Sequence, residues 1–103
     1  MDKRFTLRIL PLFEQDMMAV RNYIALNLQN PAAALRLVED TEKTILKRLN
    51  NPLGFEQYKS VRDRKHPYYR INIRNFTVFY VVIGDVMEVR RFVYSRRNLP
   101  EIV

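Results

Sequence analysis

The sequence contains no cysteine, no tryptophan and one histidine, His66. Disulfides and thiol chemistry are therefore excluded, and His66 with carboxylates alone is a poor ligand set for zinc. We expect neither a metal nor a cofactor. The chain has no run approaching the roughly 18 apolar residues that span a membrane, and its N-terminus lacks the apolar stretch of a signal peptide. We therefore expect a cytoplasmic protein with no membrane contact.

Glycine and proline are also scarce, with two and five copies among 103 residues. This leaves little room for linkers or low-complexity tracts. Hydrophobic residues make up 48% of the chain and aromatic residues 12%, a composition typical of globular proteins and unlike that of disordered chains. A chain of this length is expected to form a single domain over residues 1–103.

Positive charge is in excess and unevenly placed. The formal net charge is +7, and residues 59–103 hold ten basic and four acidic groups, whereas residues 1–58 hold eight and seven. A basic surface concentrated in one part of the chain favours an anionic partner, either a nucleic acid or an acidic protein segment. The alternative is a solvated face that only keeps the protein soluble.

The first half of the chain shows one strand and two helices. Residues 5–10 alternate as a strand does, and Pro11 ends the pattern. Spacings of three and four then predict a helix of about four turns, with an apolar stripe of Phe13, Met17, Val20, Ile24 and Leu28. Asn30-Pro31 begins a second helix, with the expected inward residues Ala34, Leu35, Val38, Ile45 and Leu49. The short connection predicts an antiparallel hairpin.

The second half, after an irregular segment at residues 53–66 with a basic end, is predicted to consist of strands. Residues 69–74 alternate between apolar and cationic, residues 76–83 are apolar on both faces, and Gly84-Asp85 predicts a tight turn into residues 86–94. The order is β-α-α-β-β-β. It predicts an α+β fold in which the helical hairpin packs on a small, mainly antiparallel four-stranded sheet, with the first strand at an edge.

Four segments in this order resemble the RelE/ParE superfamily of type II toxins. They are the opening strand with Phe13-Glu14-Gln15-Asp16-Met17, the helix start Asn30-Pro31-Ala32-Ala33-Ala34, the strand Asn75-Phe76-Thr77-Val78-Phe79-Tyr80, and the ending Val89 to Asn98. The resemblance covers nearly the whole chain. It implies the fold above and a toxin of a plasmid-stabilisation or addiction module, held inactive by a cognate antitoxin protein.

The superfamily contains ParE-type inhibitors of DNA gyrase and RelE-type nucleases that cut mRNA on the ribosome. RNA cleavage needs a proton acceptor, a proton donor and cations around the phosphate. If the protein is a nuclease, we expect Tyr94, Arg70 and Arg96 to be catalytic. The wider set of residues expected to contact the target or nucleic acid is Lys65, His66, Arg74, Arg91 and Arg97.

Two differences from the nucleases of the superfamily favour gyrase inhibition over RNA cleavage. Thr77 stands where the superfamily's nucleases carry an arginine, and Tyr94 stands where some carry a histidine. The ending Tyr94-Ser95-Arg96-Arg97-Asn98 resembles the ParE side. ParE-like gyrase inhibition is therefore the expected function and RelE-like RNA cleavage the alternative, which leaves open whether the protein is an enzyme.

Some of these residues also have plain structural interpretations. His66 fits a surface histidine, and Tyr80 fits a core tyrosine with one hydrogen bond. Arg90 and Arg91 are neighbours on a strand, so we expect them on opposite faces.

Overall fold

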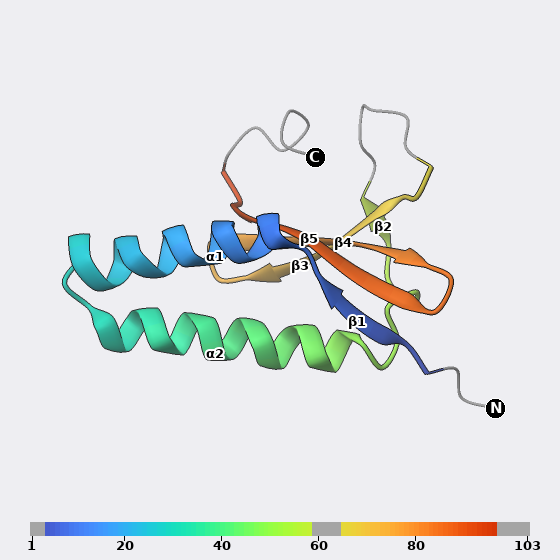
Figure 1. Cartoon of the computed structure of the whole chain (residues 1–103), viewed down its shortest axis with the longest axis horizontal. Helices are drawn as coiled ribbons and strands as arrows, with labels where there is room; N and C mark the ends of the chain where they lie inside the picture. The colour runs from blue at the N-terminus through green and yellow to red at the C-terminus, as the bar shows by residue number, and fades with distance from the viewer. Residues whose placement is uncertain (1–3, 59–64, 97–103) are drawn as a thin grey trace.

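The computed structural model describes residues 4–58 and 65–96. A helical hairpin packs against one face of a β-sheet, and the far end of the hairpin projects beyond the sheet (Figure 1). This confirms the α+β class. The elements in chain order are β1 (Thr6–Ile9), α1 (Pro11–Asn22), the π-helical turn η1 (Tyr23–Asn27), α2 (Pro31–Arg48), β2 (Gln57–Tyr58), β3 (Tyr68–Ile73), β4 (Phe76–Ile83) and β5 (Val86–Tyr94).

The sheet has five strands in the order β1-β5-β4-β3-β2, and not the four that the sequence predicts. The additional strand is β2, which pairs antiparallel to β3 through Gln57 with Tyr69 and Tyr58 with Tyr68. It lies within the segment expected to be irregular, because two residues are too few to show an alternation. The first strand does lie at an edge, where β1 runs parallel to β5.

A β-bulge interrupts the pairing of β4 with β5. Phe79 is opposite Arg91, but the next residue, Tyr80, is opposite Val89, which leaves Arg90 as an extra residue. Directly paired residues share a face, so Arg91 starts from the side of Phe79, opposite the main core. Arg90 and Arg91 therefore do not point to opposite faces as expected, because the bulge breaks the strict alternation.

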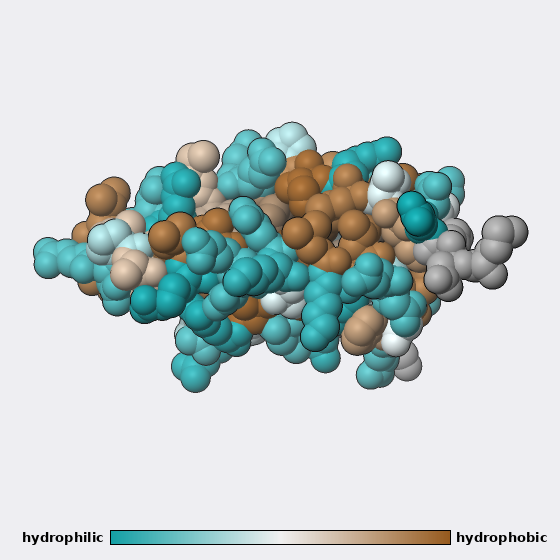
Figure 2. All heavy atoms as spheres, turned by 90° about the horizontal axis from the view of Figure 1, so that it is seen from below, coloured by the Kyte–Doolittle hydropathy of each residue, from teal (hydrophilic) through white to brown (hydrophobic). Residues whose placement is uncertain are grey.

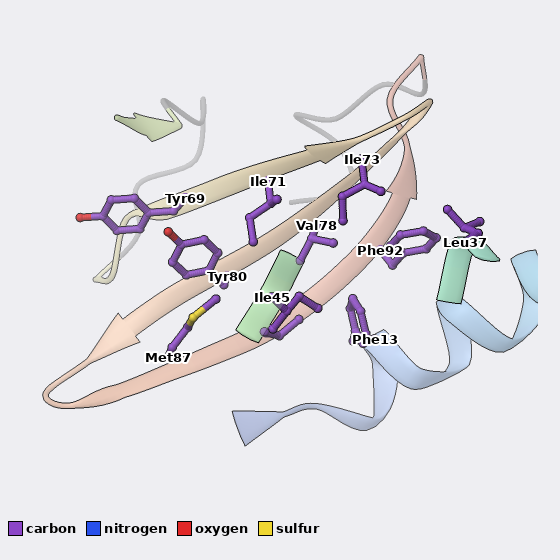
Figure 3. Close-up of a cluster of buried hydrophobic side chains, with 11 residues drawn as sticks. Phe13, Leu37, Ile45, Tyr69, Ile71, Ile73, Val78, Tyr80, Met87 and Phe92 are labelled. Atoms are coloured by element: carbon purple, nitrogen blue, oxygen red, sulfur yellow. The ribbon is translucent and has the colours of Figure 1, made fainter. Parts of the chain in front are cut away.

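The core lies between the sheet and the helices, and aromatic rings form much of it (Figure 3). The Phe92 ring packs edge-on against Phe13 at 5.9 Å between centroids and stacks on Phe76 at 4.9 Å. Tyr69 stacks on Tyr80 at 5.3 Å. A smaller cluster on the opposite face of the sheet consists of Tyr68, Phe79, Val81 and Val93.

The two helices differ in detail from the predicted stripes. The buried residues of α2 are Ala34, Leu37, Thr41 and Ile45, while Leu35 is 58% exposed. Leu35 and Leu37 differ by two positions and so occupy different sides of a helix, and only packing on the sheet decides which one is buried. Leu28 is exposed because η1 bonds its N–H to the Tyr23 carbonyl five residues back, which shifts the phase of the apolar stripe.

Gln29 connects the helices with a backbone φ of 50°, in the left-handed region that is costly for a residue with a Cβ atom. We expect Gln29→Gly to raise the free energy of unfolding by roughly 0.5–1 kcal/mol. Glycine relieves the backbone strain in the folded state, and the greater entropy of glycine in the unfolded chain offsets part of that gain. Thermal unfolding would show a midpoint a few degrees higher. The matched control is Gln15→Gly inside α1, which should lower stability by about 1 kcal/mol. A fall for both variants would contradict the prediction.

Candidate functional site: an arginine face and an apolar groove

Three arginines start from the face of the sheet opposite the main core, and one of them, Arg91, turns over the edge of β5 to Asp16 of α1. Phe79 of β4 is opposite Arg70 on β3 and Arg91 on β5. Arg70, Phe79 and Arg91 therefore occupy one row across the three strands. The strand spacing puts the backbones of Arg70 and Arg91 about 10 Å apart. Arg90 joins them through the bulge, and its guanidinium lies 5.8 Å from the ring of Tyr68. We call Arg70, Arg90 and Arg91 the arginine face.

Carboxylates hold two of these arginines. Arg91 donates from Nε to Asp16 Oδ2 at 2.8 Å and from Nη2 to Oδ1 at 3.2 Å, and the hydrogen bond with Asp16 raises the pKa of Arg91. Arg90 Nε donates to Glu88 Oε2 at 2.8 Å. Arg70 has no carboxylate partner among the described residues, and its guanidinium lies 5.3 Å from the ring centroid of Tyr58. Of the three, Arg70 is therefore best placed to bind an external anion.

Glu88 is a nearly buried carboxylate between two arginines. Oε1 accepts from Arg8 Nη1 at 3.2 Å and Oε2 from Arg90 Nε. Burial alone would raise the pKa of Glu88, but the hydrogen bonds from Arg90 and Arg8 outweigh it and hold the pKa below its ordinary value.

The pH dependence of stability follows from Glu88. Because its folded pKa is depressed, the contribution is present above the unfolded pKa of about 4.3 and is lost as the pH falls through the folded value. We expect Glu88→Gln to cost about 1–2 kcal/mol at neutral pH, because it leaves two arginines without their carboxylate. Urea unfolding of both proteins should show that difference shrinking below pH 4. An equal difference at every pH would show that the charge of Glu88 contributes nothing.

The residues expected to form a nuclease site are not brought together. Tyr94 lies on the helix side of the sheet, where its ring contacts Phe76 edge-on at 5.8 Å, whereas Arg70 lies on the arginine face. Arg96 is exposed in the turn after β5. A different tyrosine, Tyr58, accompanies Arg70.

Tyr58 and Arg70 line a small polar pocket of about 280 Å³ together with Glu56 and Gln57. Sequence reasoning missed Glu56 and did not link Tyr58 to Arg70, because β2, which places both residues beside Arg70, carries no periodic signal. The pocket offers a cation, a carboxylate and a phenol at one place on the surface.

The other expected contact residues are dispersed. Lys65 is exposed and His66 half-buried in the segment before β3. Arg74 lies in the turn between β3 and β4, where it forms a half-exposed ion pair with Asp40 of α2. Arg97 lies outside the described residues.

Thr77 occupies the position where an arginine was expected for a nuclease, and it is buried. Its hydroxyl donates to Asn72 Oδ1 at 3.2 Å and is 2.8 Å from Ser95 Oγ. This small polar network ties β4 to β3 and to the residue after β5, so Thr77 has a structural role in the sheet.

Arg48, which sequence reasoning did not single out, fixes the segment that leads into β2. Its Nη1 donates to Tyr80 Oη at 2.9 Å and to the Arg70 carbonyl at 3.2 Å, and its guanidinium lies 3.4 Å from the Phe55 ring centroid. Tyr80 Oη in turn donates to the Pro52 carbonyl at 2.8 Å. Burial raises the pKa of Tyr80, against the opposing effect of Arg48. Tyr80 is thus a core tyrosine, as expected, with two hydrogen bonds where one was predicted.

An apolar groove opens between α1, α2 and β1. Its volume is about 400 Å³. Figure 2, which views the molecule from the side of α2, shows hydrophobic side chains gathered near the centre of the surface. Met18 and Leu46 at the groove are 53% and 56% exposed, and exposed apolar patches of this kind mark interaction sites. The groove is lined by Leu7, Ile9, Phe13, Glu14, Met17, Met18, Arg21, Val38, Thr41, Glu42, Ile45 and Leu46.

Residues 4–58 and 65–96 offer neither a metal site nor a membrane-spanning helix. No three histidines, cysteines or carboxylates in these ranges come close enough together to hold a metal ion. In the same ranges no helix is long and apolar enough to cross a membrane.

Residues 7–99 match the family described as "ParE toxin of type II toxin-antitoxin system, parDE". None of the curated proteins matches the chain. A solved structure described as "Chromosomal ParDE TA system from P. aeruginosa" shares the fold, with a TM-score of 0.67 and 17% identity over 89% of this chain and 97% of that one. Because the family match spans most of the sequence, the chain belongs to the ParE family of type II toxin–antitoxin toxins.

Proposed function

We propose that the protein arrests growth by binding DNA gyrase in the cytoplasm and that a cognate antitoxin neutralises it. The observation that carries the choice of gyrase over RNA is the separation of Tyr94 from Arg70 on opposite faces of the sheet. Cleavage needs several cations around one phosphate together with a proton-transfer group, and the pocket that Tyr58 shares with Arg70 is lined, among the described residues, by one arginine only. Inhibition by binding needs only a complementary surface.

The antitoxin is expected to use both the groove and the arginine face. An apolar groove walled by two helices suits an amphipathic segment of the partner. Two of the three arginines on the other face are already paired, so Arg70 is the one expected to attract acidic side chains. A disordered antitoxin segment that folds on binding can cover surfaces this far apart.

Supercoiling by purified gyrase tests the target. We expect the protein to block supercoiling of a relaxed plasmid or to trap cleaved DNA, and the neighbouring gene's antitoxin to reverse the effect. Relaxation by topoisomerase I should be unchanged, which controls for general DNA binding by a basic protein. Undisturbed gyrase at saturating protein would refute the proposal.

RNA cleavage is the alternative outcome, and the pocket of Glu56, Tyr58 and Arg70 is the arrangement that would support it. Translating ribosomes with a labelled mRNA provide the measurement. Cleavage that Arg70→Ala and Tyr58→Phe abolish would place the activity at that pocket. We expect intact mRNA.

A further inference from the structure

The apolar groove of this basic protein is bordered mainly by acid. Two carboxylates, Glu14 on α1 and Glu42 on α2, line it with one arginine, Arg21. Both glutamates are exposed, and neither forms an ion pair with any residue in the described ranges. The groove therefore has a local charge opposite in sign to the net charge of +7.

The groove has the dimensions of a helix-binding site. Its lining residues recur at spacings of three and four on both helices, from Phe13 to Arg21 on α1 and from Val38 to Leu46 on α2. Each wall is about 12 Å long, which matches about two turns of a third helix laid between them. The floor is apolar, so the occupant must present an apolar stripe.

The carboxylates determine what flanks that stripe. A partner that covers one of these carboxylates without pairing it loses binding free energy, because the charge is removed from water. An acidic side chain of the partner next to the carboxylate would add charge repulsion. A lysine or arginine of the partner would pair with Glu14 or Glu42 instead. A nucleic acid is disfavoured here for the same reason, since its phosphates would meet these carboxylates.

We propose that the groove selects an amphipathic helix of the antitoxin whose apolar stripe is flanked by lysine or arginine, and that Glu14 and Glu42 are specificity-determining residues for the cognate antitoxin. This inference rests on the proposed neutralisation by an antitoxin. The antitoxin segment that lies in the groove is then basic, even though the toxin itself has a net charge of +7. Acidic antitoxin segments belong at the arginine face.

Three labelled peptides of about 18 residues, long enough to form a helix, test this selection. They share one leucine stripe and differ only in flanking residues, which are all lysine, all glutamine or all glutamate. Fluorescence anisotropy measures their binding to the full chain. We expect the lysine peptide to bind about tenfold more tightly than the glutamate peptide, against the net charge of the protein. The preference should weaken with added salt.

Charge-removing variants locate the preference. In the double variant Glu14→Gln, Glu42→Gln the lysine preference should fall below about twofold. Glu39→Gln is the matched control, because Glu39 is an exposed glutamate of α2 that does not line the groove, and it should leave the preference intact. Both glutamates are exposed, so the variants should fold, as circular dichroism would verify.

The outcomes separate this inference from the proposed function. Equal binding of the three peptides, a glutamate preference, no binding at all, or a lysine preference that persists in the double variant would each overturn the role of Glu14 and Glu42. Failure of the proposed function would be seen in different measurements, as undisturbed gyrase activity or as normal growth of cells that express the protein. A lysine preference that depends on both glutamates supports the inference whatever the toxin's target.

Discussion

Asp16→Ala is expected to lower the free energy of unfolding by about 3 kcal/mol, since it removes hydrogen bonds to a charged group in a partly buried site. Oδ2 of Asp16 accepts from the Phe92 backbone N–H at 3.0 Å as well as from Arg91 Nε. The chain leaves the edge of β5 after Leu10, whose N–H donates to the Val89 carbonyl. Beyond that point Asp16 of α1 satisfies the strand edge that β1 no longer covers.

Urea denaturation of purified variants would measure this effect. Gln15→Ala, at the exposed neighbouring position of α1, is the control and should be within about 0.5 kcal/mol of the parent. In a double-mutant cycle, Asp16→Ala should cost much less when Arg91 is already alanine, because the two residues act as one unit. Additive losses would mean that the ion pair contributes nothing and that the bond to Phe92 accounts for the whole effect.

Met18→Asp combined with Leu46→Asp is expected to release the toxin from its antitoxin. Both side chains are exposed at the groove, so the isolated protein should fold normally. Covering the exposed half of each one on binding is worth about 1–1.5 kcal/mol, and a carboxylate in its place adds a desolvation cost, so the double variant should bind the antitoxin about 1,000-fold more weakly. Titration calorimetry would show the loss of affinity, and co-expression with the antitoxin would no longer restore growth.

Leu26→Asp is the control for this prediction. Leu26 lies in η1 at the end of the hairpin and is 72% exposed, outside the groove. It carries the same change from an apolar to an acidic side chain, and we expect it to be neutralised as fully as the parent. If the groove variant also bound the antitoxin normally, the antitoxin would have to use another surface.

Local signals in the sequence were sufficient for most elements of the fold. Asn30 caps α2 as predicted, because its side chain accepts from the Ala33 N–H at 3.1 Å. Gly84 supplies the positive φ of 61° that the turn between β4 and β5 requires. Each depends on residues a few positions apart, so composition and spacing alone contain the information.

Candidate site residues were harder to predict because a site depends on which face and which strand each residue occupies. A one-residue bulge places Arg90 and Arg91 on the same face, and the position of Tyr94 on β5 takes it away from Arg70. Spacing along the chain contains neither fact, since both depend on the register between strands. The pocket at Tyr58 likewise depends on pairing of β2 with β3.

The sequence by itself determined the α+β class, the helical hairpin, the edge position of the first strand and the resemblance to ParE toxins. Tertiary structure alone decided the fifth strand, the side of α2 that is buried, the arginine face and the groove with its two glutamates. The physical reason is the separation along the chain between the residues that interact. Periodicity and capping act within one element, whereas register, burial and charge pairing join residues far apart in the chain, such as Asp16 with Arg91.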